Sequence, residues 1–241
     1  SSTTSGSGGG TLTAINPATG ANQWQTNINL TAYNQESVTQ GVIIVPFAAT
    51  QGGSLNRLAG YDAGTGKQLW QTAALPTQTT IESLVSGTGV VALNIIGQSA
   101  TSSLTVLDAK TGKQIWQVAA PTFPVKLQGT PPPGFPPQTY SARISSLFAA
   151  DGLVLMGFSA GVPAGTGGFA FTPLQSGITA YNAQTGAKEW STSFAATNRE
   201  PDGMVANSSA VFVTLSTLNF GSGTPTPNAI ANAALAIASG K

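Results

Sequence analysis

The chain has 241 residues and a formal net charge of +1, and only 7% of its residues are charged. This balance excludes the basic surface that binding to nucleic acid or to an anionic membrane requires. The sequence contains no His and no Cys, which excludes His-based catalytic triads, thiolate metal sites and disulfides.

The chain opens on a stretch of Ser, Thr and Gly at residues 1–10, which we expect to be a flexible lead-in. No apolar run approaches the roughly 18 residues of a membrane helix, so no membrane span is expected. The remaining residues, 11–241, suit a single all-β domain in length. Their surface residues are Ser, Thr, Gln and Asn more than Lys and Glu, which favours a secreted, cell-surface or periplasmic protein.

A short phrase then repeats through the whole chain. It runs Leu12–Trp24, Leu58–Trp70, Leu104–Trp116 and Ile178–Trp190, and a faint fifth copy begins at Ala234. Each copy starts as an apolar strand, continues with an Asp or Asn that can accept hydrogen bonds from a turn, then has a Gly that can take positive φ, and ends on Trp. We predict that each copy is a β-hairpin with structural roles for these residues: Asn16, Gly20, Trp24, Asp62, Gly66, Trp70, Asp108, Gly112, Trp116, Asn182, Gly186 and Trp190.

The spacing of the copies predicts the architecture. Gly20, Gly66 and Gly112 are 46 residues apart, and later intervals are longer. Each interval contains two further strands. The inner ones are expected at Glu36–Thr39, Ile81–Ser86, Arg143–Phe148 and Met204–Asn207, and the next ones start at Val42, Val90, Leu153 and Val211. Four strands per forty-odd residues is typical of a β-propeller blade, so we predict an all-β propeller of about four antiparallel blade equivalents.

Three insertions interrupt the repeat, at about 121–140, 161–173 and 219–228. The first is rich in Pro and contains Phe123, Phe135 and Tyr140. It is either a stiff surface loop or an interaction loop that docks a partner. The second is rich in Gly but matches a phosphate-binding loop poorly.

Few residues are candidates for chemistry. Glu36 and Glu82 fall at the same distance after the phrase glycine, and Arg143 lies near the equivalent place in the next interval. They are either solvated strand ends or a site for a cation or polar ligand at the mouth of the propeller channel. No catalytic residue and no metal-ligand set is identified.

The Asp/Asn-x-x-Thr-Gly-x-x-x-Trp pattern of the phrase resembles the repeat of pyrroloquinoline quinone (PQQ) type propellers. That family includes quinoprotein dehydrogenases and the cofactor-free outer-membrane assembly lipoprotein of the Bam complex. The resemblance implies a propeller and leaves the activity open. A dehydrogenase of this family would need a calcium ion held by Glu and Asn, a catalytic Asp, a Trp stacked on the quinone and often a disulfide. Here no Cys is present, every Trp belongs to a phrase, and no Asp matches the catalytic one.

The sequence therefore favours a non-catalytic extracellular or cell-envelope scaffold that binds protein partners or copies of itself. The alternative is part of a PQQ-dependent dehydrogenase whose catalytic residues lie outside this sequence, and PQQ and calcium are expected only in that case. Carbohydrate binding is a weaker third hypothesis. Because the strand pattern starts and stops within blades, unpaired edges could recruit further strands, giving a homo-oligomer or a filament.

Overall fold

The computed structural model describes residues 10–28, 36–48, 53–98, 101–124, 139–160, 175–194, 199–206, 210–219 and 226–236, with the backbone alone for 199, 217–219 and 226–236. The described residues form strands and no helix. Accordingly, no helical segment of this part of the chain has the length and apolar character needed to cross a bilayer. The predicted lead-in, Phe135 and most of the second and third insertions lie outside the described residues.

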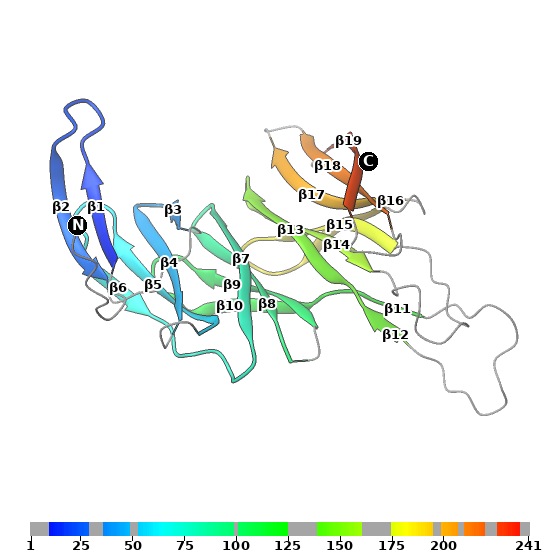
Figure 1. The fold of residues 1–241 in the computed structure, drawn as a ribbon, viewed down its shortest axis with the longest axis horizontal. Helices are drawn as coiled ribbons and strands as arrows, with labels where there is room; N and C mark the ends of the chain where they lie inside the picture. The colour runs from blue at the N-terminus through cyan, green and yellow to red at the C-terminus, as the bar shows by residue number, and fades with distance from the viewer. Residues whose placement is uncertain are drawn as a thin grey trace, which may run out of the picture.

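Five antiparallel sheets follow one another in chain order (Figure 1). The first sheet is β1 (Gly10–Ile15) and β2 (Asn22–Ile28); the second is β3 (Ser37–Thr39), β4 (Val42–Ala48), β5 (Leu55–Asp62) and β6 (Gln68–Gln71); the third is β7 (Thr80–Gly87), β8 (Val90–Ile96), β9 (Ser102–Asp108) and β10 (Gln114–Ala119). After a two-stranded ribbon of β11 (Thr122–Pro124) and β12 (Thr139–Ser141), the fourth sheet is β13 (Arg143–Ala150), β14 (Leu153–Ala160), β15 (Gln175–Asn182) and β16 (Lys188–Phe194), and the fifth is β17 (Arg199–Ala206), β18 (Ala210–Asn219) and β19 (Thr226–Ala236).

The sheets are blades of a propeller. Within each sheet the strands pair in sequence order, and the first strands β3, β7, β13 and β17 lie along the inner side of an arc (Figure 1). Each first strand contacts the first strand of the next sheet. The prediction of an all-β propeller with four-stranded antiparallel blades is confirmed.

The hairpin phrases form as predicted. In the second sheet, Asp62 Oδ1 accepts hydrogen bonds from the backbone N–H and the hydroxyl of Thr65, both at 2.8 Å. Gly66 follows with a φ of +69°, in the left-handed region that favours glycine. The other three copies have the same Asp or Asn acceptor and the same positive φ at their glycines.

Two sequence-based expectations about the strands need correction. The inner strand of the fifth sheet begins at Arg199 and not at Met204, because it pairs with the long strand β18 from Thr217 onward. Residues Phe123 and Tyr140 of the first insertion belong to the ribbon β11–β12, where they lie opposite each other. Pro46 lies within β4, which runs on to Ala48. The short strand β3 pairs with β4 only as far as Ile44, so no described strand pairs with β4 beside Pro46 on that side, where a missing N–H is tolerated.

The core lies in the gaps between neighbouring sheets. We call the space between the second and third sheets the 2/3 gap; its buried residues include Ile44, Leu58, Ile81, Leu93 and Leu107. The space between the third and fourth sheets is the 3/4 gap. Its buried residues include Leu104, Val106, Ile144, Met156 and Phe158. Most buried side chains of the described residues therefore join one blade to the next.

Candidate functional site at the inner strands

The inner strands share an irregularity at one position. The pairing of β7 with β8 shifts between Ile81 and Ser83, which leaves Glu82 as the extra residue of a β-bulge. The same shift leaves Ser145 extra in β13 and Asp202 extra in β17. A bulge bends its strand and re-aims the side chain of the extra residue, and bulges are frequent at the rims of sheets and near active sites.

Glu82 is held by two neighbours. Asn94 of β8 is 1% exposed, and its Nδ2 donates to Glu82 Oε2 at 2.8 Å and to the backbone carbonyl of Ile144 at 3.2 Å. Arg143 Nη2 lies 3.7 Å from Glu82 Oε1. The Arg143 side chain is 66% exposed, so this ion pair is worth about 1 kcal/mol at most. Asn94 and Arg143 thus tie the third sheet to the fourth.

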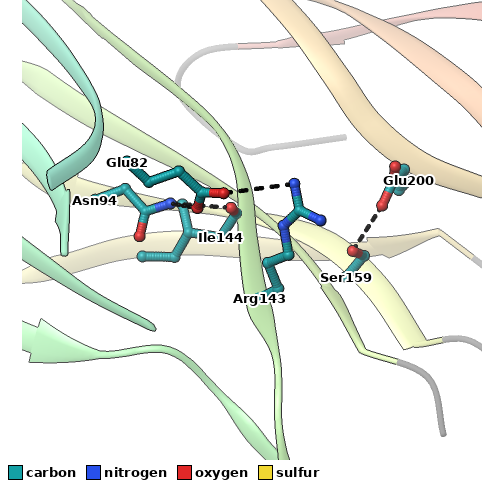
Figure 2. Close-up of polar contacts among 6 residues, drawn as sticks. All are labelled: Glu82, Asn94, Arg143, Ile144, Ser159 and Glu200. Carbon is teal, nitrogen blue, oxygen red and sulfur yellow. Dashed lines mark hydrogen bonds and ion pairs between the residues drawn. The ribbon is translucent and has the colours of Figure 1, made fainter. Parts of the chain in front are cut away.

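The polar row continues into the fifth sheet. Ser159 of β14, which pairs with Arg143, donates its hydroxyl to Glu200 Oε2 at 2.8 Å. Ser216 of β18 donates to Asp202 Oδ2, also at 2.8 Å. Figure 2 shows Arg143 with Glu82 on one side and Glu200 on the other. Carboxylates and a guanidinium alternate along the inner side of three successive blades.

Glu36 is not part of this row. It lies two residues closer to its turn glycine, Gly41, than Glu82 lies to Gly89. The next residue, Ser37, shares a hydrogen bond of 2.5 Å with Ser86 near the far end of β7. Glu36 instead lines a separate hollow of about 390 Å³. The expectation that Glu36 and Glu82 are equivalent is wrong, since strand register is set by the hairpin turn and not by the distance from the preceding phrase.

The described residues bring few acidic side chains close together. They contain no group of three or more acidic side chains that could hold a metal ion. The carboxylates of the polar row already accept hydrogen bonds from Asn94, Ser159 and Ser216. Asn94 Oδ1 is buried without a partner, but one amide oxygen does not make a metal site.

The tryptophans join consecutive blades. The Nε1 of Trp70 donates to the carbonyl of Ala109 in the next blade at 2.9 Å, and Trp116 donates in the same way to Ala183. The indole of Trp70 also covers Gly112, where an added Cβ would lie 2.4 Å from the ring. The sequence predicted a structural Trp but missed this docking. The signal was present: a small Gly recurs in the phrase that follows each Trp.

The residues of the predicted interaction loop face inward where the structure describes them. Phe123 stacks on Phe158 of β14 with ring centroids 5.9 Å apart, and it lies 6.0 Å from Tyr140. Phe123 and Tyr140 are half-buried against the core of the 3/4 gap. Burial raises the pKa of the Tyr140 hydroxyl above its ordinary value. Partner docking by this segment stays a prediction.

A cavity of about 650 Å³ opens in the 2/3 gap. Leu58 of β5 lines one side, Leu93, Ile95 and Thr105 of the third sheet line the other, and the connection that contains Leu75 closes one end. Its size falls within the range of small-ligand pockets. Sequence reasoning did not predict it, because the repeat pattern alone does not show how completely a gap is filled.

Comparisons with known proteins agree with the propeller architecture described above. The family model of the outer membrane protein assembly factor BamB matches residues 2–126 and again residues 100–226. None of the curated proteins matches the sequence.

Among solved structures, BamB from Moraxella catarrhalis is 16% identical with a TM-score of 0.51, and the match covers 90% of this chain and 54% of that protein. The quinohemoprotein alcohol dehydrogenase ADHIIG from Pseudomonas putida HK5 is 16% identical with a TM-score of 0.53, covering 95% of this chain and 38% of that one. A europium-containing methanol dehydrogenase is 14% identical with a TM-score of 0.50, covering 94% and 47%. The chain therefore spans about half the length of these proteins or less, and at these identities the likeness shows a shared fold.

Proposed function

The chain belongs to the PQQ-like repeat propeller family of the outer membrane protein assembly factor BamB, and on that premise we propose that it is a non-catalytic scaffold that binds protein in the cell envelope. The family description supports an envelope location and a role in assembly. Propellers of this kind present loops and sheet faces on a rigid frame, which is the usual way such scaffolds bind partners.

One observation carries the proposal. The Trp and Glu side chains are of the types that bind PQQ and calcium in quinoprotein dehydrogenases, and here they form contacts between blades. Trp24, Trp70 and Trp116 donate to carbonyls of the following blade. Glu82 is bound by Asn94 and lies beside Arg143. An indole fixed between two sheets is not free to stack on a cofactor, which supports a structural role for these groups.

An exposed apolar pair supports protein binding. Val205 of β17 and Phe212 of β18 lie opposite each other and are 63% and 43% exposed. In the third sheet, the residue at the position of Phe212 is Ala92, which is fully buried against the next blade. Two exposed apolar side chains side by side form a surface on which another protein, a second copy or a further blade of the same protein can pack.

The alternative function is part of a PQQ-dependent dehydrogenase. It is favoured by the likeness to the alcohol and methanol dehydrogenases, of which this chain spans 38% and 47%. The residues that bind the quinone would then lie outside this sequence. This alternative predicts PQQ and calcium in the larger protein, whereas the scaffold proposal predicts neither.

A cofactor titration distinguishes the two functions. The protein is purified at its full natural length, so that any residues outside this sequence are included, then incubated with PQQ and calcium chloride and passed over a desalting column. Its absorbance and its alcohol-dependent dye reduction are measured. The scaffold proposal predicts no retained quinone band and no dye reduction. A stoichiometric quinone band with dye reduction would overturn it.

The binding face is tested by sedimentation velocity over a range of concentrations. If the Val205–Phe212 face binds a second copy, the wild type associates as concentration rises and Phe212→Ser associates less. Ile15→Ser is the matched control, because Ile15 is 57% exposed on β1. Equal association of both variants and the wild type would remove this face from the proposal.

A further inference from the structure

The cavity in the 2/3 gap has the lining of a site for an uncharged group. Its floor is apolar and includes Leu58, Leu93 and Ile95. Among the described residues that line it, none is charged; the polar ones are Asn, Gln, Ser and Thr. An ionised group would lose its hydration there without gaining a counter-charge, so the cavity disfavours charged ligands.

The 3/4 gap shows what such a space accepts. Strand register makes Phe158 the equivalent of Ile95, since each lies opposite an inner-strand isoleucine, Ile144 and Ile81 respectively. In the 3/4 gap the ring of Phe123, from the ribbon β11–β12, stacks on Phe158 at 5.9 Å. The chain thus seals one inter-blade gap with an aromatic side chain on an extended segment and leaves the equivalent gap open.

An unpaired polar group lies in the open gap. Thr105 of β9 lines the cavity, is 4% exposed, and its Oγ1 has no hydrogen-bond partner in the described structure. Its equivalent in the fourth sheet, Thr179, shares a hydrogen bond of 3.0 Å with Ser191. Buried hydroxyls are normally paired, so the unpaired Thr105 can form a hydrogen bond with a group bound in the cavity. Unpaired buried hydroxyls also occur at Tyr140, Ser145 and Ser146.

We propose that the 2/3 gap binds an aromatic side chain carried by an extended, uncharged segment of a partner protein, in the way that Phe123 fills the 3/4 gap. The ring packs on Leu93 and Ile95, and a backbone group of the segment pairs with Thr105. This inference rests on the proposed protein-binding function and adds the chemistry that the partner presents.

The test uses a capped peptide, N-acetyl-Thr-Phe-Pro-amide, which copies Thr122–Pro124. It is titrated into the isotope-labelled full chain while backbone amide NMR shifts are recorded. We expect saturable shifts at Leu93, Ile95 and Thr105, with a Kd of about 1–10 mM because one side chain supplies most of the contact. The same peptide with Lys in place of Phe is expected to give none.

Variants place the binding in the cavity. Ala119 is an exposed residue at the cavity mouth, so Ala119→Trp is expected to occlude it and to weaken binding at least tenfold. Ala187→Trp, at an exposed alanine outside the lining, is the matched control and is expected to bind as the wild type does. Thr105→Val is expected to weaken binding about fivefold, the effect of one lost hydrogen bond.

The inference would be overturned by no shifts at the cavity residues, by equal shifts with the Lys peptide, or by binding that Ala119→Trp leaves unchanged. Equal affinity for 4-methylphenol would also overturn it and assign the cavity to a small neutral aromatic molecule. The readout is independent of the cofactor titration. If the protein binds both the quinone and the peptide, only the scaffold function is refuted. If it binds neither, only this inference is refuted.

Discussion

The 2/3 gap and the 3/4 gap are built by the same repeated strands and end in different states. In the 3/4 gap, Phe158 and Phe123 stack, and Tyr181 packs against Trp116 with ring centroids 5.6 Å apart. In the 2/3 gap, Ile95 and Leu107 take the positions of Phe158 and Tyr181, and a cavity of about 650 Å³ remains. The backbone register is the same, so the size of the side chains decides whether a gap is core or pocket.

The difference shows that two groups of residues in the repeat have separate roles. Phrase residues such as Trp70 and Gly112 dock one blade on the next in both gaps. Other residues fill the remaining space, some within the phrases (Leu107 and Tyr181) and some between them (Ile95 and Phe158), and their size differs from one gap to the next. A pocket can therefore arise in one gap of a propeller while its neighbour stays closed, because each gap packs almost independently.

The largest expected effect on stability comes from a substitution in the closed 3/4 gap. Phe158→Ala is expected to lower the free energy of unfolding by about 3–5 kcal/mol, since it removes a buried ring and leaves a cavity. Ile95→Ala, at the equivalent position, is expected to cost about 2 kcal/mol because its side chain already borders open space. Urea unfolding of both variants checks this. Equal losses would mean that the two gaps are packed alike.

The next largest effect on stability is expected where the Trp of one blade packs on the Gly of the next, a contact that both gaps share. Gly112 has a φ of +68°, and an added Cβ would lie 2.4 Å from the ring of Trp70. We expect Gly112→Ala to destabilise the fold by about 3 kcal/mol, from backbone strain together with displacement of the indole.

The control for this variant is Gly20→Ala. Gly20 has a φ of +72° and no atom within 4 Å of an added Cβ, so only the strain of about 1 kcal/mol is expected. Thermal and urea unfolding provide the comparison. If the two substitutions cost the same, the indole contributes nothing to the choice of glycine.

Smaller effects on stability, of opposite sign, are expected at the equivalent residues Thr105 and Thr179. Thr105→Val is expected to stabilise the fold by about 1 kcal/mol, because it removes a buried hydroxyl that has no partner in the described structure. Thr179→Val is expected to destabilise it by about 1 kcal/mol, because it breaks the bond to Ser191. Urea midpoints measure both. A loss of stability in Thr105→Val would show that its hydroxyl is already satisfied.

The smallest effect is a pH dependence at a turn. The hydrogen bond from the Thr65 hydroxyl is the main cause that holds the pKa of Asp62 below its ordinary value of 3.8. The folded state therefore favours the ionised form, and the resulting stability is present above pH 4 and lost as pH falls through the lowered pKa. Asp62→Asn, the residue type that Asn16 and Asn182 supply in other copies, is expected to reduce the drop in Tm between pH 5 and pH 3. An unchanged drop would contradict this.

The candidate site was only partly predictable. Glu82 and Arg143 were identified from their places in successive repeats, and the structure brings them together at 3.7 Å. Glu36 was placed with them wrongly, because counting residues from a glycine ignores where the hairpin turn falls. Asn94, which links Glu82 to the next blade, gave no signal: a polar residue within an apolar strand does not show what it faces.

The sequence by itself determined the repeating unit: hairpins with an Asp or Asn acceptor, a left-handed glycine and a closing Trp, four strands to a blade. These features depend on residues near one another in the chain, where turn chemistry and alternation act directly. The tertiary structure alone decided which blade each Trp docks on, where the bulges set Glu82 and Asp202, and that the 2/3 gap stays open while Phe123 closes its neighbour. Those outcomes depend on contacts between sheets far apart in sequence, whose fit is set by the volumes of facing side chains.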